Sequence, residues 1–539
     1  MTIELTSMNL LCYTTFITIA LLRILALGAM AQEDAAGTSR VIIAYKPTAS
    51  SAIRKAVAAA RGNHGQAGVE MVLADVPVME LPSGKLSAMA VELPTDSLGG
   101  LSRDPNVAFI EEDMKRYPHT LSTPSTGNPY APGQLVPYGI QMVQADLLAG
   151  TDASNRKVCI IDSGYNLGHE DLPSDSNIVT GEDMGIAPWA YDTESHGSHV
   201  AGTISALNNN GTGVVGVHSN NSLKLHIINV FGTNEYVYDS DVVGAAFRCM
   251  YAGANVINLS LGGEDGSKWM SMAFDEIYKS NVLIIASAGN GGDSVINYPA
   301  GYSSVVSVAA VDENLTQAFF STFNNDVELS GPGVDVLSTV VLGMGSISSL
   351  VVGSTSYYPG SLLGSPKLSR SGFLADFGLG DKIDNAVLGK VCLIARGIIT
   401  FNEKVLNCEI SGGIAAVIYN NRAGTFYSSV GSDTTIPSLT VSDVDGIALL
   451  TQLGQTAVVT VTASNYAYAS GTSMAAPHVS AVAALVWARN LKCTAAQIRN
   501  SLAKSALDLG KKGRDKYYGF GMVQAKAADD RIKKKGCGK

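Results

Sequence analysis

Residues 158–164 read Val-Cys-Ile-Ile-Asp-Ser-Gly, an apolar run that ends in a carboxylate and a glycine. The apolar run predicts a fully buried strand, and the glycine predicts a tight turn directly after it. In open α/β sheets, reactive groups gather at the carboxyl ends of the strands. Asp162 is therefore expected at such an edge, and the fold class predicted is α/β.

Two further stretches contain a histidine and a serine, the residue types that act together with a carboxylate in nucleophilic catalysis. Residues 195–203 read Ser-His-Gly-Ser-His-Val-Ala-Gly-Thr, with small residues after a histidine, as a helix packed tightly at a cleft needs. Residues 471–478 read Gly-Thr-Ser-Met-Ala-Ala-Pro-His, in which Ser473 opens an alanine-rich run of helix-forming composition. Unpaired N–H groups and the helix dipole at such a position stabilise an oxyanion. Taken alone, Ser473 is equally consistent with an ordinary helix cap.

The order of these residues favours catalysis. A nucleophilic serine needs a base, and the base needs an orienting carboxylate. The chain supplies Asp162, His196 and Ser473 in that order, which among unrelated triad folds is the order of the subtilisin fold. Residues 286–290 read Ala-Ser-Ala-Gly-Asn after an apolar run, and the side chain of Asn290 is suited to donate a hydrogen bond to an oxyanion.

These four motifs together resemble those of the subtilisin family of serine proteases, the subtilases. The resemblance implies that Asp162 orients the imidazole, that His196 is general base and then general acid, and that Ser473 is the nucleophile. It implies an oxyanion hole made by Asn290 and the Ser473 backbone N–H, in a three-layer α/β sandwich with a mainly parallel sheet. The expected activity is that of a serine-type endopeptidase working through an acyl-enzyme. Ser198 stands where the family has threonine, and no loss of activity is expected from it.

The resemblance also describes how a peptide substrate would bind. The substrate is expected to lie as an extended strand, paired through its backbone, with one side chain in a pocket. The binding residues implied are Ser260, Leu261, Gly262, Ala288, Gly289 and Asn297. Asn297 occupies the pocket floor, where many relatives have a smaller residue. This predicts a pocket that is shorter or more polar than one built for large aromatic side chains.

A structural calcium ion is implied as the cofactor. Residues 207–214 read Leu-Asn-Asn-Asn-Gly-Thr-Gly-Val, a tight turn rich in the oxygen donors that Ca²⁺ prefers. The ligand set implied by the family is Gln134, Asp171, Leu207, Asn209, Thr212 and Val214. The loop is longer than in the shortest relatives, and an asparagine–glycine turn without metal is the alternative.

The N-terminal residues predict export. Residues 9–30 are largely apolar apart from Arg23, and residues 29–31 form a small-x-small cleavage site. We therefore predict a signal peptide over residues 1–31 and a secreted, extracellular protein; an uncleaved anchor is the alternative, which Arg23 disfavours. No later segment contains the roughly 18 uninterrupted apolar residues of a spanning helix, so no stable membrane association is expected after cleavage.

A small unit precedes the catalytic pattern. Strands are predicted at 40–47, 89–93 and 107–113, and helices at 52–61 and from Thr95. This order resembles the inhibitory propeptide of subtilases, assigned to residues 38–117. The resemblance implies a folding chaperone whose C-terminal tail occupies the active-site cleft until it is cut. Residues 118–133, rich in Pro, Ser, Thr and Gly, form a linker that holds the processing site, with Tyr117 and His119 as candidates for the residue before the cut.

The chain between His196 and Ser473 is far longer than a minimal subtilase needs, which predicts an inserted domain. Strands are predicted at 389–397, 416–419 and 436–441, and helices at 401–415 and after 441. This pattern resembles the protease-associated (PA) domain, predicted at 341–464 within a catalytic domain of residues 134–340 and 465–539. We expect the insert to act as a lid or docking surface; a passive spacer is the alternative.

The cysteines agree with export. Of seven cysteines, Cys12 lies in the predicted signal peptide, which leaves six for three disulfide bridges. The pairs expected are Cys392–Cys408, Cys493–Cys537 and Cys159–Cys249. A buried free thiol at Cys159 is the alternative, because that residue lies in an apolar strand.

Composition limits the partners. The formal net charge of −10 gives no support for nucleic-acid binding. The partners expected are protein or peptide substrates and the chain's own propeptide, and we expect a monomer. Two other classes were weighed: a catalytically weak relative acting as a binding module, and an esterase or acyltransferase using the same triad. The intact motifs argue against the first; the peptide-pairing strand and the propeptide favour amide substrates without excluding ester cleavage.

Overall fold

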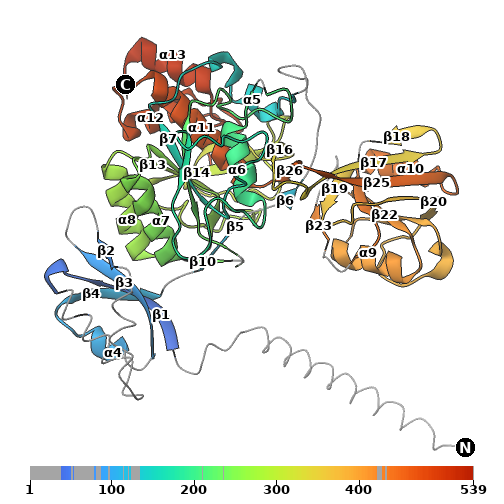
Figure 1. The fold of residues 1–539 in the computed structure, drawn as a ribbon, viewed down its shortest axis with the longest axis horizontal. Coiled ribbons are helices and arrows are strands. Elements are labelled where there is room, and N and C mark those ends of the chain that lie inside the picture. Colours follow the sequence, from blue (N-terminus) through green and yellow to red (C-terminus); the bar gives the residue numbers. More distant parts are fainter. Residues whose placement is uncertain are drawn as a thin grey trace, which may run out of the picture. The chain divides into compact units, whose positions relative to one another are not determined.

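The chain divides into two compact units, Met1–Asp113 and Met114–Lys539 (Figure 1). The computed structural model describes residues 38–49, 53, 78–80, 86–94, 98–112, 115–118, 121–122, 134–208, 210–232, 234, 236–357, 359–397, 399–421, 428–430 and 434–537. The predicted signal peptide, most of the linker, His119 and Asn209 lie outside these residues. Within the described part of the chain, no helix is both long and apolar enough to cross a membrane.

The first unit contains an antiparallel sheet with the strand order β2-β3-β1-β4. Its elements are β1 (Thr38–Tyr45), β2 (Val78–Glu80), β3 (Ser87–Pro94), α4 (Leu98–Leu101) and β4 (Val107–Glu112). Alternate residues of β1 and β3 form its core together with Ile53. The three strands predicted from the sequence are confirmed; the short strand β2 was not predicted.

The second unit contains seven parallel strands in the order β15-β14-β13-β11-β7-β9-β8. They are β7 (Lys157–Asp162), β8 (Val179–Gly181), β9 (Lys224–Asn229), β11 (Val256–Leu259), β13 (Leu283–Ser287), β14 (Val305–Val311) and β15 (Val327–Pro332). Helices α6 (His196–Ser205) and α11 (Thr472–Arg489) pack together on one side of the sheet, and α7 (Asp239–Tyr251) packs with α8 (Lys268–Lys279) on the other (Figure 1). Strands buried along their whole length are expected between two helix layers. The predicted three-layer α/β sandwich is confirmed.

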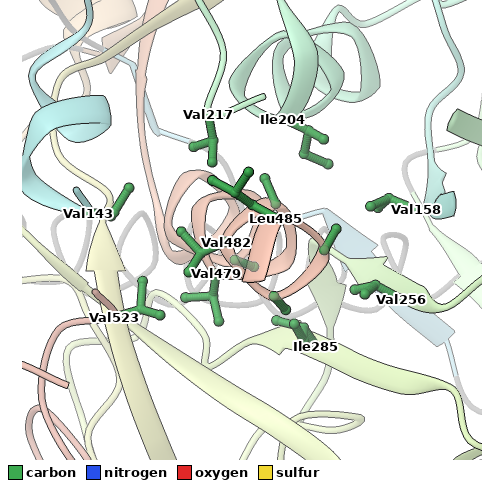
Figure 2. Close-up of a cluster of buried hydrophobic side chains, with 14 of the residues drawn as sticks. Val143, Val158, Ile204, Val217, Val256, Ile285, Val479, Val482, Leu485 and Val523 are labelled. Carbon is green, nitrogen blue, oxygen red and sulfur yellow. The ribbon is translucent and has the colours of Figure 1, made fainter. Parts of the chain in front are cut away.

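Helix α11 runs through the main hydrophobic core. All of its residues from Thr472 to Ala488 are buried, so the helix is apolar or small all round rather than on one face. Figure 2 shows its side chains Val479, Val482 and Leu485 among the strand residues Val158, Val256 and Ile285. Because Ser473 stands at the N-terminal end of this helix, the packing of the core fixes the position of its backbone.

The predicted insert has its own sheet of nine strands. Its elements are β17 (Gly345–Val352), β18 (Thr355–Tyr357), β19 (Gly360–Leu363), β20 (Ser369–Asp376), β21 (Val391–Ala395), β22 (Ala415–Tyr419), β23 (Ser428–Ser429), β24 (Ser438–Val441) and β25 (Thr456–Ser464), with α9 (Phe401–Ile410) and α10 (Asp443–Leu450). The chain enters it from β16 (Val336–Thr339) and returns through β26 (Tyr466–Ser470), and these two strands pair antiparallel. Helix α9 ends before the predicted position because Gly412, with a φ of +80°, makes the turn that follows it.

Three disulfide bridges join the expected cysteine pairs. Cys159 in β7 is bonded to Cys249 in α7, so the alternative of a free thiol at Cys159 is wrong. Cys392 in β21 is bonded to Cys408 in α9 inside the insert. The third bridge, Cys493–Cys537, closes the C-terminal region that contains α12 (Ala495–Ser505) and α13 (Ala525–Lys535).

Candidate active site

The parallel sheet brings the candidate side chains to one edge. Asp162 is the last residue of β7, Ser260 follows β11 directly, and Asn290 follows β13 after a short turn. Strand β11 lies between β7 and β13, so the three carboxyl ends are neighbours. His196 and Ser473 reach the same edge as the first residue of α6 and the second residue of α11. This is the edge at which open α/β sheets bind their ligands.

Asp162 holds the imidazole of His196. The Nδ1 atom of His196 lies 2.6 Å from Oδ1 of Asp162, and both side chains are buried. Burial disfavours protonation of His196, but the charge and hydrogen bond of Asp162 outweigh it and raise the pKa of the imidazole above its usual value. A Cβ atom on Gly197 would lie 2.2 Å from the carbonyl oxygen of Gly164, so only glycine permits α6 to approach the turn after Asp162 this closely.

Ser473 and Ser260 exchange hydrogen bonds. The hydroxyl of Ser473 donates to the carbonyl oxygen of Ser260 at 3.0 Å, and the hydroxyl of Ser260 donates to the carbonyl oxygen of Ser473 at 2.9 Å. The second bond is explained by Pro477, which has no N–H to donate to the carbonyl four residues earlier. These bonds tie the start of α11 to the end of β11.

The amide of Asn290 is oriented by Thr472. The Asn290 Oδ1 atom accepts hydrogen bonds from the backbone N–H and the hydroxyl of Thr472, each at 2.9 Å. This leaves Nδ2 of Asn290 as a buried donor with no protein partner among the described residues. Nε2 of His196 is likewise buried and has no protein partner among them. A buried polar atom without a partner is costly in a folded protein and calls for an explanation, which at an active site can be a bond to the reacting group. The arrangement therefore offers a donor for an oxyanion and an acceptor for a proton.

Sequence reasoning missed Asp192, which organises the segment before α6. Its buried carboxylate accepts hydrogen bonds from Ser163 Oγ, from the backbone N–H groups of Glu194, Ser195 and Ser198, and from Ser198 Oγ, at 2.7–3.0 Å. An aspartate shortly before a helix, followed by small polar residues, is a signal for such a turn. The hydroxyl that Ser198 shares with the family's threonine is thus used structurally.

Near Ser473, a strand of the chain itself lies between two other strands. Strand β5 (Lys115–Pro118) lies between β10 (Val237–Tyr238) and β12 (Leu261–Gly262), antiparallel to both. On the other side of Ser473, β6 (Leu121–Ser122) pairs antiparallel with Ala469 and Ser470 of β26. Thus the predicted substrate-binding residues Leu261 and Gly262 pair with an extended peptide.

Three of the predicted pocket residues, Ala288, Gly289 and Asn297, lie together near the carboxyl end of β13. Ala288 is buried, and Gly289 has a φ of +110°, which favours glycine. A Cβ atom on Gly289 would lie 2.5 Å from Nδ2 of Asn297, so the Asn297 amide lies directly against this turn. The structure therefore places a polar amide beside Ala288 and Gly289.

Four of the predicted calcium ligands lie close together. The side-chain Nε2 of Gln134 donates hydrogen bonds to the carbonyl oxygens of Leu207 at 2.5 Å and Val214 at 3.4 Å. The N–H of Val214 donates to Oδ2 of Asp171, whose pKa burial raises to about 7. The segment thus contains a buried carboxylate and two backbone carbonyl oxygens, which are oxygen groups of the kind that Ca²⁺ prefers. Asn210, rather than a residue named in the prediction, is the described loop side chain that contacts Asp171, at 2.7 Å.

The fold and this constellation define the class of protein. The chain belongs to the family described as "Subtilase family", whose model matches residues 153–376 and 382–521, more than half of the chain. It is accordingly a serine endopeptidase of the subtilisin type that acts on peptide or protein substrates.

Characterised relatives agree with this assignment. Subtilisin DY from Bacillus licheniformis is 41% identical over 215 residues, which are 38% of this chain and 75% of that protein. Subtilisin amylosacchariticus from Bacillus subtilis subsp. amylosacchariticus is 31% identical over 333 residues, 58% of this chain and 76% of the relative. Among solved structures, the psychrophilic subtilisin-like protease Apa1 from Pseudoalteromonas sp. AS-11 has a TM-score of 0.60 at 37% identity, covering 75% of this chain and 99% of that one. Fervidolysin from Fervidobacterium pennivorans, at 22% identity and a TM-score of 0.55 over 93% of this chain and 62% of its own, shares the fold.

Proposed function

We propose that the protein is a secreted endopeptidase made as a zymogen, which first cuts its own chain and then other polypeptides through an acyl-enzyme on Ser473. The observation that carries this proposal is the chain's own strand β5, paired with β12 directly beside Ser473. Three disulfide bridges support export, because such bridges persist in oxidising compartments.

The geometry supports a division of roles among the site residues. Ser473 Oγ attacks the scissile carbonyl, and Nε2 of His196 takes the proton that Oγ loses. Asp162 keeps the proton of the imidazole on Nδ1 and stabilises the imidazolium that forms. Asn290 Nδ2 and the backbone N–H of Ser473, which as the second residue of a helix has no intrahelical acceptor, stabilise the oxyanion. His196 then returns the proton to the leaving amine.

Substrate binding would release the nucleophile. The Ser473 hydroxyl donates to the carbonyl oxygen of Ser260, and this oxygen is also the next backbone acceptor of the strand edge that begins with Leu261. A substrate N–H that bonds to this carbonyl would compete with the hydroxyl. Ser473 would then turn towards Nε2 of His196, so that binding and activation occur together.

The strand register supports one of the two candidate processing sites over the other. Tyr117 pairs with Gly262 and Pro118 with Leu261. If an extended substrate continues this register by one residue, position 119 would come opposite Ser260. Ser260 is the residue that contacts Ser473, and Leu121 is already paired on the far side with Ser470. We therefore propose His119–Thr120 as the processed bond, with His119 rather than Tyr117 before the cut. The imidazole of His119 is suited to a pocket that contains the amide of Asn297.

A fluorophosphonate probe tests the assignment of the nucleophile. Only an activated serine reacts rapidly with such a probe, since a free hydroxyl is a weak nucleophile. We expect one covalent adduct per processed chain, and tandem mass spectrometry of the digest should place it on Ser473. An adduct on another serine, or an equally labelled Ser473→Ala chain, would contradict the proposal.

We further propose that Gln134, Asp171, Leu207 and Val214 hold a structural Ca²⁺, with the loop residues Asn209 and Thr212 completing the set. The support is the burial of the Asp171 carboxylate against the loop 207–214, in which the carbonyl oxygens of Leu207 and Val214 lie near the side-chain amide of Gln134. The ion would neutralise the carboxylate and cross-link the loop 207–214 to the segment that begins at Gln134. Its contribution is to stability, and no chemical step involves it.

Removal of calcium is expected to lower the unfolding temperature of the processed protein by about 5 °C, because the bound ion stabilises only the folded state. Differential scanning calorimetry with and without EGTA measures this. Excess Ca²⁺ should restore the transition and Mg²⁺ should not, since the smaller ion demands octahedral geometry. In Asp171→Asn the EGTA effect should vanish. A wild-type transition that is unchanged by EGTA would refute the site.

We propose that the insert is a PA domain that serves as a docking surface for the part of the substrate after the cut bond. The support is its position: β19 and β23 of the insert lie next to β6, which continues the bound peptide beyond Ser473. A polypeptide longer than the central groove would thus meet the insert.

A further inference from the structure

The residue before the candidate base has an unusual backbone conformation. Ser195 directly precedes His196 and stands at the N-cap position of α6. Its φ is +71°, in the left-handed region that residues other than glycine rarely adopt. A serine at an N-cap ordinarily has an extended backbone and caps the helix with its hydroxyl, but the side chain of Ser195 makes no such bond. Ser195 is therefore not an ordinary helix cap, and other contacts must hold its conformation.

The hydroxyl of Ser195 contacts the first residues of the insert instead. It accepts a hydrogen bond from the backbone N–H of Val341 at 3.1 Å and donates one to Sδ of Met344 at 3.6 Å. Both residues follow β16 and precede β17, where the chain enters the insert. The backbone N–H of Ser195 donates to the carboxylate of Asp192 at 2.9 Å. The catalytic domain thus holds the backbone of this residue, and the insert holds its side chain.

The segment 340–344 is itself fixed at the base of the insert. Asn465, the residue between β25 and β26, accepts hydrogen bonds from the backbone N–H groups of Val340 and Gly343, each at 2.9 Å. Asn465 is also tied to the catalytic domain, because its Nδ2 donates to the carboxylate of Glu170 at 2.8 Å. This segment is therefore a fixed support for the residue before the candidate base.

The rest of α6 is held separately. The hydroxyl groups of Ser338 and Thr339 in β16 donate to carbonyl oxygens in the first turn of α6, each at 2.8 Å. These bonds fix the body of the helix. The orientation of its first residue, His196, depends in addition on the φ and ψ of Ser195, since these angles set the direction in which the chain enters the helix.

We infer that Ser195 is a positioning residue, through which the base of the insert sets the orientation of the His196 imidazole. The inference rests on the proposed function, because it takes His196 as the general base. A rotation of the backbone at Ser195 would lengthen the 2.6 Å bond between His196 and Asp162 and turn Nε2 away from Ser473. The insert would thus contribute to the rate of the chemical step, and a passive spacer would not.

Ser195→Gly tests this role, because glycine adopts a positive φ freely and the change removes only the side-chain bonds. The processed variant is expected to have a kcat about tenfold below that of wild type with nearly unchanged KM, as a small misplacement of a catalytic group predicts. The low-field proton resonance of His196 Nδ1–H, which reports the bond to Asp162, should move to higher field. Ser195→Asn should recover most of the lost kcat, because asparagine tolerates a positive φ and retains an acceptor for the N–H of Val341.

A second variant tests whether the insert acts through Ser195. Met344→Leu conserves the volume of the side chain and removes the sulfur acceptor. By itself it should lower kcat by a smaller factor, with a smaller shift of the same resonance. In the Ser195→Gly background it should have no further effect, because the hydroxyl that the sulfur contacts is already absent.

Asn281→Gly is the matched control. Asn281 also has a positive φ, of +68°, and its side chain accepts a hydrogen bond from the N–H of Ala495 at 2.7 Å. It lies just before β13, at the end of that strand opposite the site. Its replacement should lower the unfolding temperature while kcat stays near that of wild type.

The outcomes separate this inference from the function on which it rests. A wild-type kcat and an unshifted resonance in Ser195→Gly would overturn it, and so would a rise in KM without a loss of kcat. An effect of Met344→Leu that is equally large in both backgrounds would also overturn it. If the wild type neither reacts with a fluorophosphonate nor cuts any peptide, the proposed function fails and the inference with it. Met344→Leu leaves the backbone of Ser195 untouched, so its own kcat and resonance decide the question even if Ser195→Gly folds poorly.

Discussion

The full chain with Ser473→Ala is expected to remain uncut, whereas the wild-type chain is expected to separate into two fragments at His119–Thr120. The substitution removes the only atom that forms the acyl bond, and loss of the nucleophile from a Ser-His-Asp triad lowers kcat on the order of a millionfold. The fold should persist, because the side chain lost is small and donates one hydrogen bond, to Ser260, worth about 1 kcal/mol. Intact-mass measurement of both purified chains gives the result.

A second measurement separates loss of chemistry from loss of folding. The uncut Ser473→Ala chain, mixed with processed wild type, should be cut in trans at the same bond, which is possible only if that segment is presented correctly. N-terminal sequencing of the wild-type product should begin at Thr120. A product that begins at Pro118 would assign the cut to Tyr117, contrary to the register of β5 and β12. Equal processing of the variant would mean that another protease makes the cut.

Asp162→Asn is expected to lower kcat about ten-thousandfold with little change in KM, as the same change does in another Ser-His-Asp triad. An asparagine amide can present a donor where Nδ1 of His196 requires an acceptor, so the proton is held on the wrong nitrogen. The substrate groove is formed by β10 and β12, which the substitution does not touch. The measurement compares kcat and KM of the wild type and of Asp162→Asn on the same peptide.

The pH profile of Asp162→Asn distinguishes an electrostatic role of Asp162 from a purely structural one, because a purely structural residue would not shift it. Burial lowers the pKa of His196, but the charge and hydrogen bond of Asp162, together with the charges of Asp192 and Glu194, raise it above its usual value. Without the charge of Asp162 the pKa falls, and because only neutral His196 accepts a proton, the acid limb of kcat/KM should move to lower pH. Asp529→Asn is the matched control: this buried carboxylate pairs with Arg489 far from the site, and its loss should lower stability while kcat stays near that of wild type. An unshifted acid limb would contradict the assigned role.

The parts that were predictable are those that depend on neighbours in sequence. The apolar run before Asp162 and the alanine-rich run after Ser473 fix their strand and helix almost without context. In the insert, the helix that begins at Phe401 was predicted at its start and missed at its end. Its start has a Thr–Glu capping box, a local signal, whereas its end depends on the backbone of Gly412.

Other parts could not be predicted because they depend on contacts between distant segments. The short strand β2 exists only through its pairing with β3, and nothing in its own residues requires it. Asp192 carries no motif of catalysis, and its hydrogen bond from the hydroxyl of Ser163, which lies after β7, could not be read from its own neighbours.

By itself, the sequence determined which side chains are available for catalysis, the order in which they occur, and the family to which that order belongs. It left open whether the cut follows Tyr117 or His119, and it gave no sign that residues 115–118 pair with two strands near Ser473. The tertiary structure shows that pairing, and its register supports the proposal that the cut follows His119. It also decided that Thr472 turns the Asn290 donor inward. The physical reason is that a register or a side-chain orientation is set by hydrogen bonds across the fold, to residues that no local pattern identifies.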